Sequence, residues 1–179
     1  MSLFLWSESS LDLKITTGIG VRDTVSFGVM AYMTGIGDKT ITPLPLYLKD
    51  ILDRVEKLDG LRDFDINQVT FNVYRKDRGD CITKHVDDRR ISGPAIGCIS
   101  LGAQCTMRFE PIERENDDSK DCSHTDVPLP PRSLQIMTND VRYKYTHAVS
   151  NESIGEPGLR VSIILRSIPL RPKRTFREF

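Results

Sequence analysis

The chain has 179 residues, about the size of one large domain, and a chain of this length can bury a core without disulfide bonds. Lys and Arg number 25 and Asp and Glu also number 25, so the formal net charge of zero excludes a histone-like polycation. No stretch approaches about 18 apolar residues, and no basic residue precedes the short apolar run 3–6. We therefore expect neither a membrane span nor a signal peptide.

We expect residues 1–179 to form a single domain with an irregular start over 1–20, because no internal repeat or low-complexity linker divides the chain. The first periodic segment follows Pro43 and Pro45 and ends at Gly60. Its apolar side chains recur at helical offsets, at Leu48, Ile51, Leu52, Val55 and Leu58. This spacing predicts a helix that packs on a sheet.

After this helix the pattern changes to the two-residue period of strands. Over residues 68–74, Val69, Phe71 and Val73 alternate with polar positions, which predicts a strand with one apolar and one polar face. The segments 95–101 and 104–109 flank Gly102-Ala103 and predict a hairpin. Two further strands are predicted at 133–138 and 159–168. One helix followed by several short strands is typical of an α+β protein with a sandwich or jelly-roll core.

Charge and cysteine content mark the remaining segments. The segment 110–127 holds seven acidic and two basic residues and predicts an exposed loop or hairpin tip. Within it, Cys122 and His124 could hold zinc, although no second ligand pair lies nearby. Cys98 and Cys105 lie in apolar segments, as expected for reduced thiols of an intracellular protein. The basic tail 171–179 could contact phosphates, act as a nuclear signal or be a solvated terminus.

Two of the three histidines belong to a pattern that can hold a metal ion. His85 and Asp87 lie two residues apart, so on an extended segment they point to the same side. His147 would come from a different strand. Two imidazoles and one carboxylate are the facial triad that holds Fe(II) in non-haem oxygenases and leaves coordination positions open. A structural histidine is the alternative, since an H-x-D pattern alone is common.

A second pattern lies in the predicted strand 159–168. Alternation places Arg160, Ser162 and Arg166 on one side of it. If that side faces the interior, a buried arginine needs an anion, and a dicarboxylate such as 2-oxoglutarate would provide one. The alternative is an outward-facing edge strand with solvated arginines.

The polar face of the strand 68–74 adds two candidates. Asn72 and Tyr74 share this face, roughly 7 Å apart along the strand, on the way to the H-x-D segment. Both side chains could hydrogen-bond the oxygens of a small ligand. A half-exposed strand face is the alternative.

The order of these residues resembles that of the AlkB family of Fe(II)/2-oxoglutarate dioxygenases. Asn72-x-Tyr74 precedes His85-x-Asp87, and the distal histidine and the two arginines follow. The segments 22–28 (RDTVSFG), 43–55 (PLPLYLKDILDRV) and 128–149 (PLPPRSLQIMTNDVRYKYTHAV) are also similar to the family. The resemblance covers about residues 20–170.

The resemblance implies a double-stranded β-helix (jelly-roll) core with one or more supporting N-terminal helices. It also implies that His85, Asp87 and His147 hold Fe(II), with 2-oxoglutarate as co-substrate and O₂ as oxidant. In such a reaction 2-oxoglutarate is converted to succinate and CO₂, and a methyl group on nitrogen is hydroxylated and lost as formaldehyde.

The co-substrate pocket follows from the same resemblance. Arg160 would bind the distal carboxylate of 2-oxoglutarate with help from Tyr74 and Asn72, and Arg166 would close the pocket near the metal-ligand turn. The family's last strand often carries Asn and Thr where this chain has Ser162 and Ile164. Serine still offers a hydrogen bond, whereas isoleucine offers none.

The substrate is indicated less sharply. Arg89 stands where the founding bacterial type carries an acid that helps to read the base, and the longer turn between Tyr74 and His85 looks closer to the branch of the fourth animal homologue. That branch has been linked to methyl-lysine in proteins as well as to nucleic acid. Basic residues near the turn are candidates for substrate binding, namely Lys84, Arg89 and Arg90.

Three functions therefore compete. The first is oxidative demethylation of an N-alkylated base in single-stranded or flipped DNA or RNA. The second is the same oxidation on methyl-lysine of a protein, whose basic segment would suit the acidic loop 110–127. The third is a non-catalytic binding module, which would require a broken triad or a lost arginine. We also expect a monomer, located in the cytoplasm, the nucleus or both.

Overall fold

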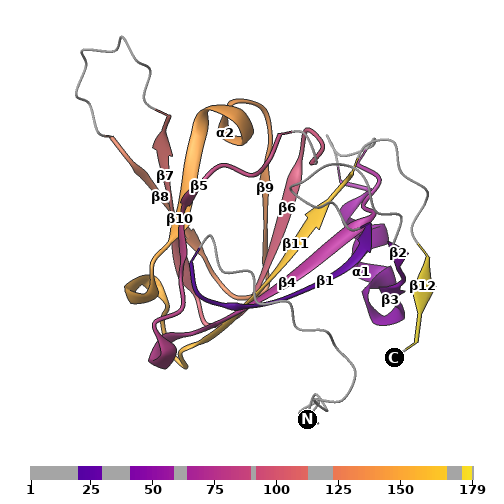
Figure 1. The fold of residues 1–179 in the computed structure, drawn as a ribbon, viewed down its shortest axis with the longest axis horizontal. Helices are drawn as coiled ribbons and strands as arrows, with labels where there is room; N and C mark the ends of the chain where they lie inside the picture. Colours follow the sequence, from indigo (N-terminus) through magenta and orange to yellow (C-terminus); the bar gives the residue numbers. More distant parts are fainter. Residues whose placement is uncertain are drawn as a thin grey trace.

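A computed structural model describes residues 20–29, 41–58, 64–89, 92–112, 123–168 and 175–178. Within these ranges two antiparallel sheets and a few short helices form the α+β jelly roll that the sequence predicts (Figure 1). The expected irregular segment up to residue 19, the tip of the acidic loop at 113–122 and the tail residues 171–174 lie outside the described residues. None of the helices in the described part is long and apolar enough to cross a membrane.

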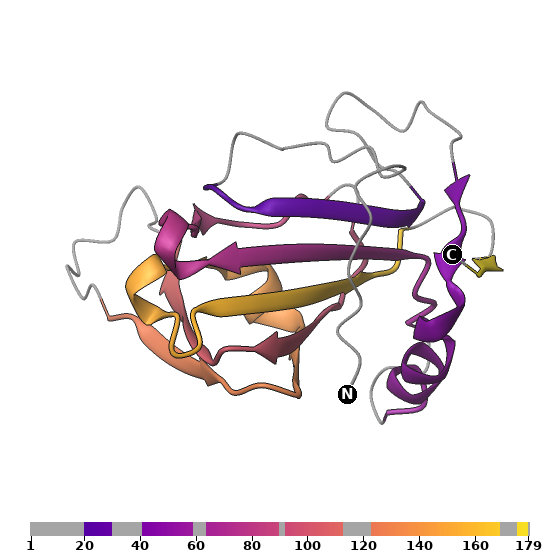
Figure 2. The same ribbon diagram turned by 90° about the horizontal axis from the view of Figure 1, so that it is seen from below.

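The larger sheet has six strands in the order β2-β1-β4-β11-β6-β9. Its strands are β1 (Asp23–Val29), β2 (Ile41–Thr42), β4 (Gln68–Arg75), β6 (Ile96–Gly102), β9 (Ser133–Met137) and β11 (Leu159–Arg166). All neighbouring strands in it are antiparallel. Figure 2 shows β1, β4 and β11 as long neighbouring strands. The strand β11, which carries the two candidate arginines, is therefore central and not an edge strand.

The smaller sheet has four strands in the order β5-β10-β7-β8. Its strands are β5 (Ile82–His85), β7 (Cys105–Pro111), β8 (Thr125–Leu129) and β10 (Tyr145–Val149). Because β7 pairs with β8, the ends of the acidic segment 110–127 are strand, and the residues between them connect a hairpin, as predicted. His124 is exposed and lies 3.7 Å from Asp126, and Cys122 is outside the described residues.

The remaining elements are short. They are β3 (Leu44–Pro45), β12 (Phe176–Arg177), α1 (Lys49–Val55), α2 (Asn139–Lys144) and the 3₁₀ turns η1 (Leu46–Leu48), η2 (Lys76–Arg78) and η3 (Asn151–Ser153). The strand β12 pairs in parallel with β3, and Phe176 packs against the main core. This end of the basic tail is therefore part of the fold.

The helix α1 covers the outer face of the larger sheet at one end. Leu48, Leu52 and Val55 are buried there against Val69, Ile163 and other apolar side chains of the sheet. The predicted helix to Gly60 is too long, because α1 ends at Val55. The amides of Lys57 and Leu58 bond carbonyls three residues back, and this tighter turn leaves Leu58 42% exposed.

The predicted hairpin around Gly102-Ala103 is wrong. The strand β6 pairs with β9 and β11 in the larger sheet, whereas β7 pairs with β8 and β10 in the smaller one. Gly102 has φ +76, and a Cβ there would lie 2.3 Å from the Leu159 carbonyl oxygen. That carbonyl accepts a hydrogen bond from the Ala103 amide at 2.8 Å. The chain therefore crosses between the sheets at this point, where only glycine fits.

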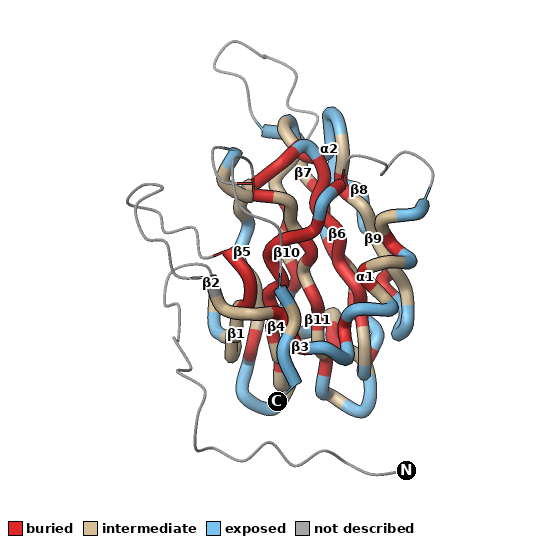
Figure 3. The backbone as a smooth tube through the Cα atoms, turned by 90° about the vertical axis from the view of Figure 1, so that its right-hand side faces the viewer, coloured by how far each residue is buried: buried red, intermediate tan, exposed pale blue. Residues whose placement is uncertain are grey.

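The two faces of the larger sheet differ in chemistry. Its outer face is apolar, as the alternation in β4 predicts. Its inner face faces the smaller sheet and carries a polar row across five strands, in register from Thr24 through Asn72, Ser162 and Ser100 to Ser133. Buried residues run along β4, β6, β10 and β11 (Figure 3). At its centre, where Asn72, Ser100 and Ser162 are buried, this inward polar face could line a binding pocket.

Candidate metal centre and co-substrate pocket

The three predicted metal ligands converge. His85 ends β5 and lies directly opposite His147 of the neighbouring strand β10, and Asp87 follows two residues after β5. One ligand atom from each residue lies within 4.8 Å of the others. The two imidazole centroids are 4.2 Å apart. The register between β5 and β10 thus places two histidines and one carboxylate at one point.

The ionisation of these side chains suits metal binding. Burial and the neighbouring His85 lower the pKa of His147 to about 4, although Asp87 opposes this shift. Burial alone would raise the pKa of Asp87, but Arg166 and the two histidines outweigh it and lower the pKa to about 2. At neutral pH, His147 is therefore neutral and Asp87 is ionised, as metal coordination requires. The Nδ1 atom of His85 lies 2.8 Å from the Thr83 carbonyl oxygen, which leaves Nε2 for a ligand.

Two arginines hold the carboxylate segment. Arg166 donates from Nη2 to Asp87 Oδ1 at 2.7 Å, and its side chain remains 19% exposed. Arg142 of α2 is buried and donates to the main-chain oxygens of Asp87 at 2.9 Å and Asp88 at 3.1 Å. Arg166 thus lies beside the proposed metal-ligand turn, and its role in the co-substrate pocket stays a prediction, whereas Arg142 was not predicted.

Arg160 lies in the polar interior and is only 1% exposed. Its Nη2 donates to Ser100 Oγ at 3.1 Å and lies 3.9 Å from Cys98 Sγ, and its guanidinium carbon is 5.1 Å from the centroid of the Tyr74 ring. Its Nε has no hydrogen-bond partner, and no carboxylate pairs with it among the described residues. The alternative of solvated arginines is therefore wrong for Arg160. A buried guanidinium without a protein anion can accept an anionic ligand.

The predicted neighbours of Arg160 line the same interior. Tyr74 is buried, and burial raises its pKa, so its hydroxyl stays protonated. Asn72 Oδ1 accepts hydrogen bonds from Arg22 Nε at 3.1 Å and Thr24 Oγ1 at 3.0 Å, and its Nδ2 lies 3.5 Å from Ser162 Oγ. The carbonyl of Asn72 is thus engaged by β1 and its N-terminal flank, a contact that the sequence did not predict.

An open groove of about 490 Å³ lies between the turn after β5, α2 and the adjoining ends of β7 and β10. Its lining residues are Arg89, Pro111, Ile112, Asp140, Tyr143, Lys144 and Tyr145. Tyr145 and His147 lie on the same face of β10, and Pro111 and Phe109 on the same face of β7, so the groove extends the inner face of the smaller sheet. Of the predicted substrate residues, Arg89 lines this groove.

Of the other two predicted substrate residues, Lys84 is not among the residues that line the groove. Lys84 is exposed and pairs with Glu110. Arg90 lies outside the described residues. Arg89 itself donates to the Tyr143 carbonyl oxygen.

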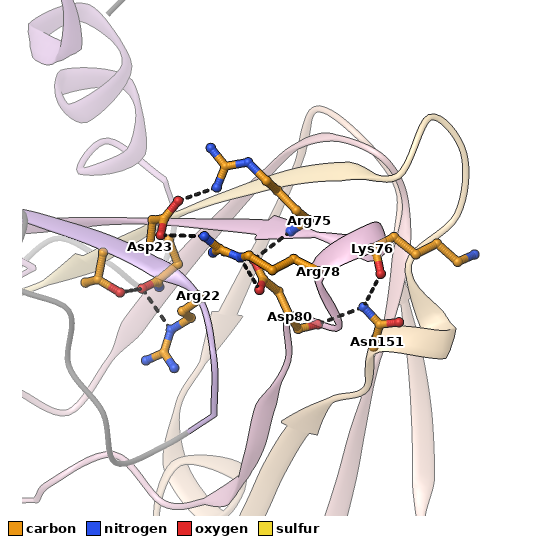
Figure 4. A network of polar contacts seen from close by, with 9 residues as sticks. Arg22, Asp23, Arg75, Lys76, Arg78, Asp80 and Asn151 are labelled. Carbon is orange, nitrogen blue, oxygen red and sulfur yellow. Dashed lines mark hydrogen bonds and ion pairs between the residues drawn. The ribbon is translucent and has the colours of Figure 1, made fainter. Parts of the chain in front are cut away.

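A polar cluster supports the turn that leads into β5 (Figure 4). Asp80 is fully buried and accepts hydrogen bonds from the Arg75 amide at 2.8 Å and from the Arg78 guanidinium. Asn151 donates to the carbonyl oxygens of Lys76 at 3.0 Å and Asp80 at 3.2 Å. The residue Asn151 follows β10, so this cluster ties the segment before His85 to the segment after His147.

Several residues of the site gave little signal in the sequence. Phe109, whose ring centroid is 6.0 Å from that of His147, follows an alternating strand pattern that does not reveal its neighbour. Asp80 looks like one more charge in the run 75–80, but it is fully buried, and its carboxylate accepts hydrogen bonds from Arg75 and Arg78 of the same run. The contact between Phe109 and His147 could have been found only from the pairing of β7 with β10.

Comparisons with known proteins agree with this geometry. The family model of the 2OG-Fe(II) oxygenase superfamily matches residues 26–166. A relative from Arabidopsis thaliana, named "Alkylated DNA repair protein ALKBH8 homolog", is 24% identical over 92% of this chain and 54% of its own length. One from Macaca fascicularis, named "tRNA (carboxymethyluridine(34)-5-O)-methyltransferase ALKBH8", is 28% identical over 81% of this chain and 21% of its own length. The chain thus spans about half of the first relative and about a fifth of the second.

A solved structure, titled "The structure of OsALKBH1", matches with a TM-score of 0.54 and 14% identity, covering 86% of this chain and 88% of that one. At this identity the match shows the jelly-roll fold alone. The relatives do not confirm the branch of the fourth animal homologue that the turn before His85 suggested. The chain belongs to the AlkB family of the 2OG-Fe(II) oxygenase superfamily, enzymes that use Fe(II), 2-oxoglutarate and O₂.

Proposed function

We propose that His85, Asp87 and His147 hold the Fe(II) and that this centre removes methyl groups from N-alkylated bases in DNA or RNA. The observation that carries the proposal is the convergence of two imidazoles and one carboxylate, each ligand atom within 4.8 Å of the others. These residues fit iron because His147 is neutral and Asp87 is ionised at neutral pH.

The negative charge of 2-oxoglutarate would balance the positive charge of the buried Arg160. Arg160 offers a buried guanidinium whose Nε has no partner, and it would grip the distal carboxylate of 2-oxoglutarate. Tyr74 and Ser162 would donate hydrogen bonds to it, and Asn72 would orient Ser162. Arg166 would hold Asp87 at the metal end of the pocket.

The reaction converts an N-methyl group, O₂ and 2-oxoglutarate into an N-hydroxymethyl group, succinate and CO₂, with the bound iron supplying the activation of O₂. The hydroxymethyl group then breaks its bond to nitrogen and leaves as formaldehyde, while the nitrogen takes up the hydroxyl proton. The chain itself orients the reacting groups and excludes water from them. Phe109 packs beside His147 and belongs to an apolar cluster that both sheets form.

Nucleic acid is supported as the substrate by the relatives and by the groove. The names of two relatives mention alkylated DNA and tRNA. The groove is lined by Arg89 and Tyr145, each two residues from a proposed metal ligand, and its two tyrosines and two cations, Arg89 and Lys144, suit a base and its phosphates. We expect this groove to admit a single-stranded or flipped nucleotide. The single domain, the monomeric state and the nuclear or cytoplasmic location stay predictions.

Formaldehyde release tests the proposal. Wild-type protein with Fe(II), 2-oxoglutarate and O₂ would be given a panel of N-methylated oligonucleotides and, in parallel, peptides with methyl-lysine. Release from oligonucleotides alone is the expected result. Release from peptides alone would select the protein demethylase instead. Succinate formation without release from either class would refute N-demethylation of both substrates while leaving the oxygenase chemistry in place.

A further inference from the structure

Two arginines join the segments that carry the proposed metal ligands. One lies before His147 and donates to the segment of Asp87, and the other follows Asp87 and donates to the segment before His147. Arg142, five residues before His147, donates to the carbonyl oxygens of Asp87 at 2.9 Å and Asp88 at 3.1 Å. Arg89, two residues after Asp87, donates to the carbonyl oxygen of Tyr143. Each segment thus anchors the main chain of the other.

The contacts of Arg142 are unusual for a buried cation. Its side chain is 2% exposed, its Nε has no hydrogen-bond partner, and its two donated bonds go to neutral carbonyls and not to a carboxylate. Burying a guanidinium in this way is costly, so overall stability gives little reason for an arginine here. The planar fork of two nitrogens is suited to holding two successive carbonyl oxygens in a fixed geometry, which a single ammonium cannot do.

The Asp87 segment needs such an anchor. Asp87 and Asp88 lie beyond the end of β5, where the sheet no longer holds the main chain. Arg166 fixes one carboxylate oxygen of Asp87 but not the peptide groups around it. The distance between Asp87 Oδ2 and His147 Nε2, 3.5 Å, therefore depends on how α2 and the turn after β5 are joined.

We propose that Arg142 is a positioning residue that sets the affinity of the metal centre by joining the Asp87 turn to the strand of His147. Arg89 supports the same junction from the other side. This inference rests on the proposed function, because it takes His85, Asp87 and His147 as the metal ligands. Residues that orient metal ligands typically change metal affinity about 10–100-fold when they are replaced.

The test measures the affinity of the full chain for Mn²⁺, a redox-stable substitute for Fe(II), by calorimetry. Arg142→Met is expected to weaken binding about 10–100-fold, and Arg142→Lys to restore only part of the loss, because it keeps the charge but not the fork. Arg89→Ala should cause a smaller loss. Arg108→Met is the matched control, since it removes an exposed arginine that pairs with Asp126 outside the groove and the metal centre.

A second measurement separates positioning from a general loss of structure. At saturating Fe(II), the concentration of 2-oxoglutarate that gives half-maximal succinate formation should be unchanged in Arg142→Lys. Circular dichroism of the metal-free variants shows whether they fold, and if Arg142→Met does not, Arg142→Lys carries the test alone. Folded variants that bind Mn²⁺ as the wild type does would overturn the inference.

The failure of the ligand assignment would look different. In that case the wild type would not bind Mn²⁺, or His85→Ala would bind it as tightly as the wild type. Loss of binding in His85→Ala together with full binding in both Arg142 variants would leave the metal centre in place and remove only the positioning role.

Discussion

Arg160 and Arg166 lie on the same face of one strand, yet the protein treats their charges differently. The guanidinium of Arg166 lies 2.7 Å from the Asp87 carboxylate, so its charge is balanced within the protein. Arg160 is more deeply buried and contacts a hydroxyl, a sulfur and an aromatic ring. Roughly 20 Å of extended chain separates the two residues, which therefore mark two ends of one polar strip.

The difference shows which part of the pocket is complete without a ligand. At the Arg166 end, removal of the cation would leave a buried carboxylate unpaired. At the Arg160 end, the cation itself is unpaired, and burying it costs free energy that only an incoming anion recovers. We therefore interpret the end of the pocket at Arg166 as balanced in charge by the protein itself. The end at Arg160 is interpreted as a site whose charge the co-substrate balances.

The strongest expected effect comes from removing a proposed metal ligand. His85→Ala should abolish succinate formation from 2-oxoglutarate, because two remaining ligands hold iron weakly. The part-buried position of His85 at the end of β5 should leave the fold intact. The matched control is His124→Ala, which removes an exposed histidine outside the site. Succinate formation at the wild-type rate by His85→Ala would contradict the assignment of His85 as a metal ligand.

The next largest effect is expected on the 2-oxoglutarate requirement when Arg160 is replaced. Arg160→Met should raise the 2-oxoglutarate concentration for half-maximal turnover about 30-fold to several-thousand-fold, since losing a buried charged contact costs about 2–5 kcal/mol. Arg108→Met, at an exposed arginine paired with Asp126, serves as the control. An unchanged requirement for 2-oxoglutarate in Arg160→Met would mean that its charge serves another purpose.

The stability of the metal-free protein should show the opposite order. Arg166→Met leaves Asp87 without its closest cation and should lower the free energy of unfolding by about 2–3 kcal/mol, less than a fully buried pair would lose. Arg160→Met removes an unbalanced charge and should leave this free energy within about 1 kcal/mol of the wild type, or raise it. Urea unfolding at pH 7 measures both. Equal losses in the two variants would remove the contrast on which the comparison depends.

Part of this arrangement could be predicted from the sequence. The two-residue spacing of His85 and Asp87 and the alternation around Arg160 and Ser162 are local patterns, and strand geometry alone places each pair on one side. The apolar outer face of β4 follows from the same rule. What the spacing cannot supply is the register that puts His147 opposite His85, because β5 and β10 are far apart in the chain.

Other features depend on distant partners and left no local signal. The pair Gly102-Ala103 looks like a two-residue hairpin turn, but the positive φ of Gly102 and its contact with Leu159 carry the chain into the other sheet. Arg142 looks like a surface residue of a short polar helix, and its burial follows from carbonyl groups more than fifty residues earlier. Contacts between residues far apart in the chain, and not local propensity, determine the path of the chain at Gly102 and the burial of Arg142.

The smallest expected effect concerns what holds Arg160 in place. Its Nη2 lies 3.1 Å from Ser100 Oγ but 3.9 Å from Cys98 Sγ, and sulfur is the weaker acceptor. A hydrogen bond to a charged group contributes about 1.5–3 kcal/mol, so Ser100→Ala should raise the 2-oxoglutarate requirement about tenfold or more. Cys98→Ala should change it less than about threefold, a free energy below that of one neutral hydrogen bond. Steady-state succinate formation measures both variants, and a larger effect at Cys98 would mean that the thiol, and not the hydroxyl, orients the guanidinium toward the co-substrate.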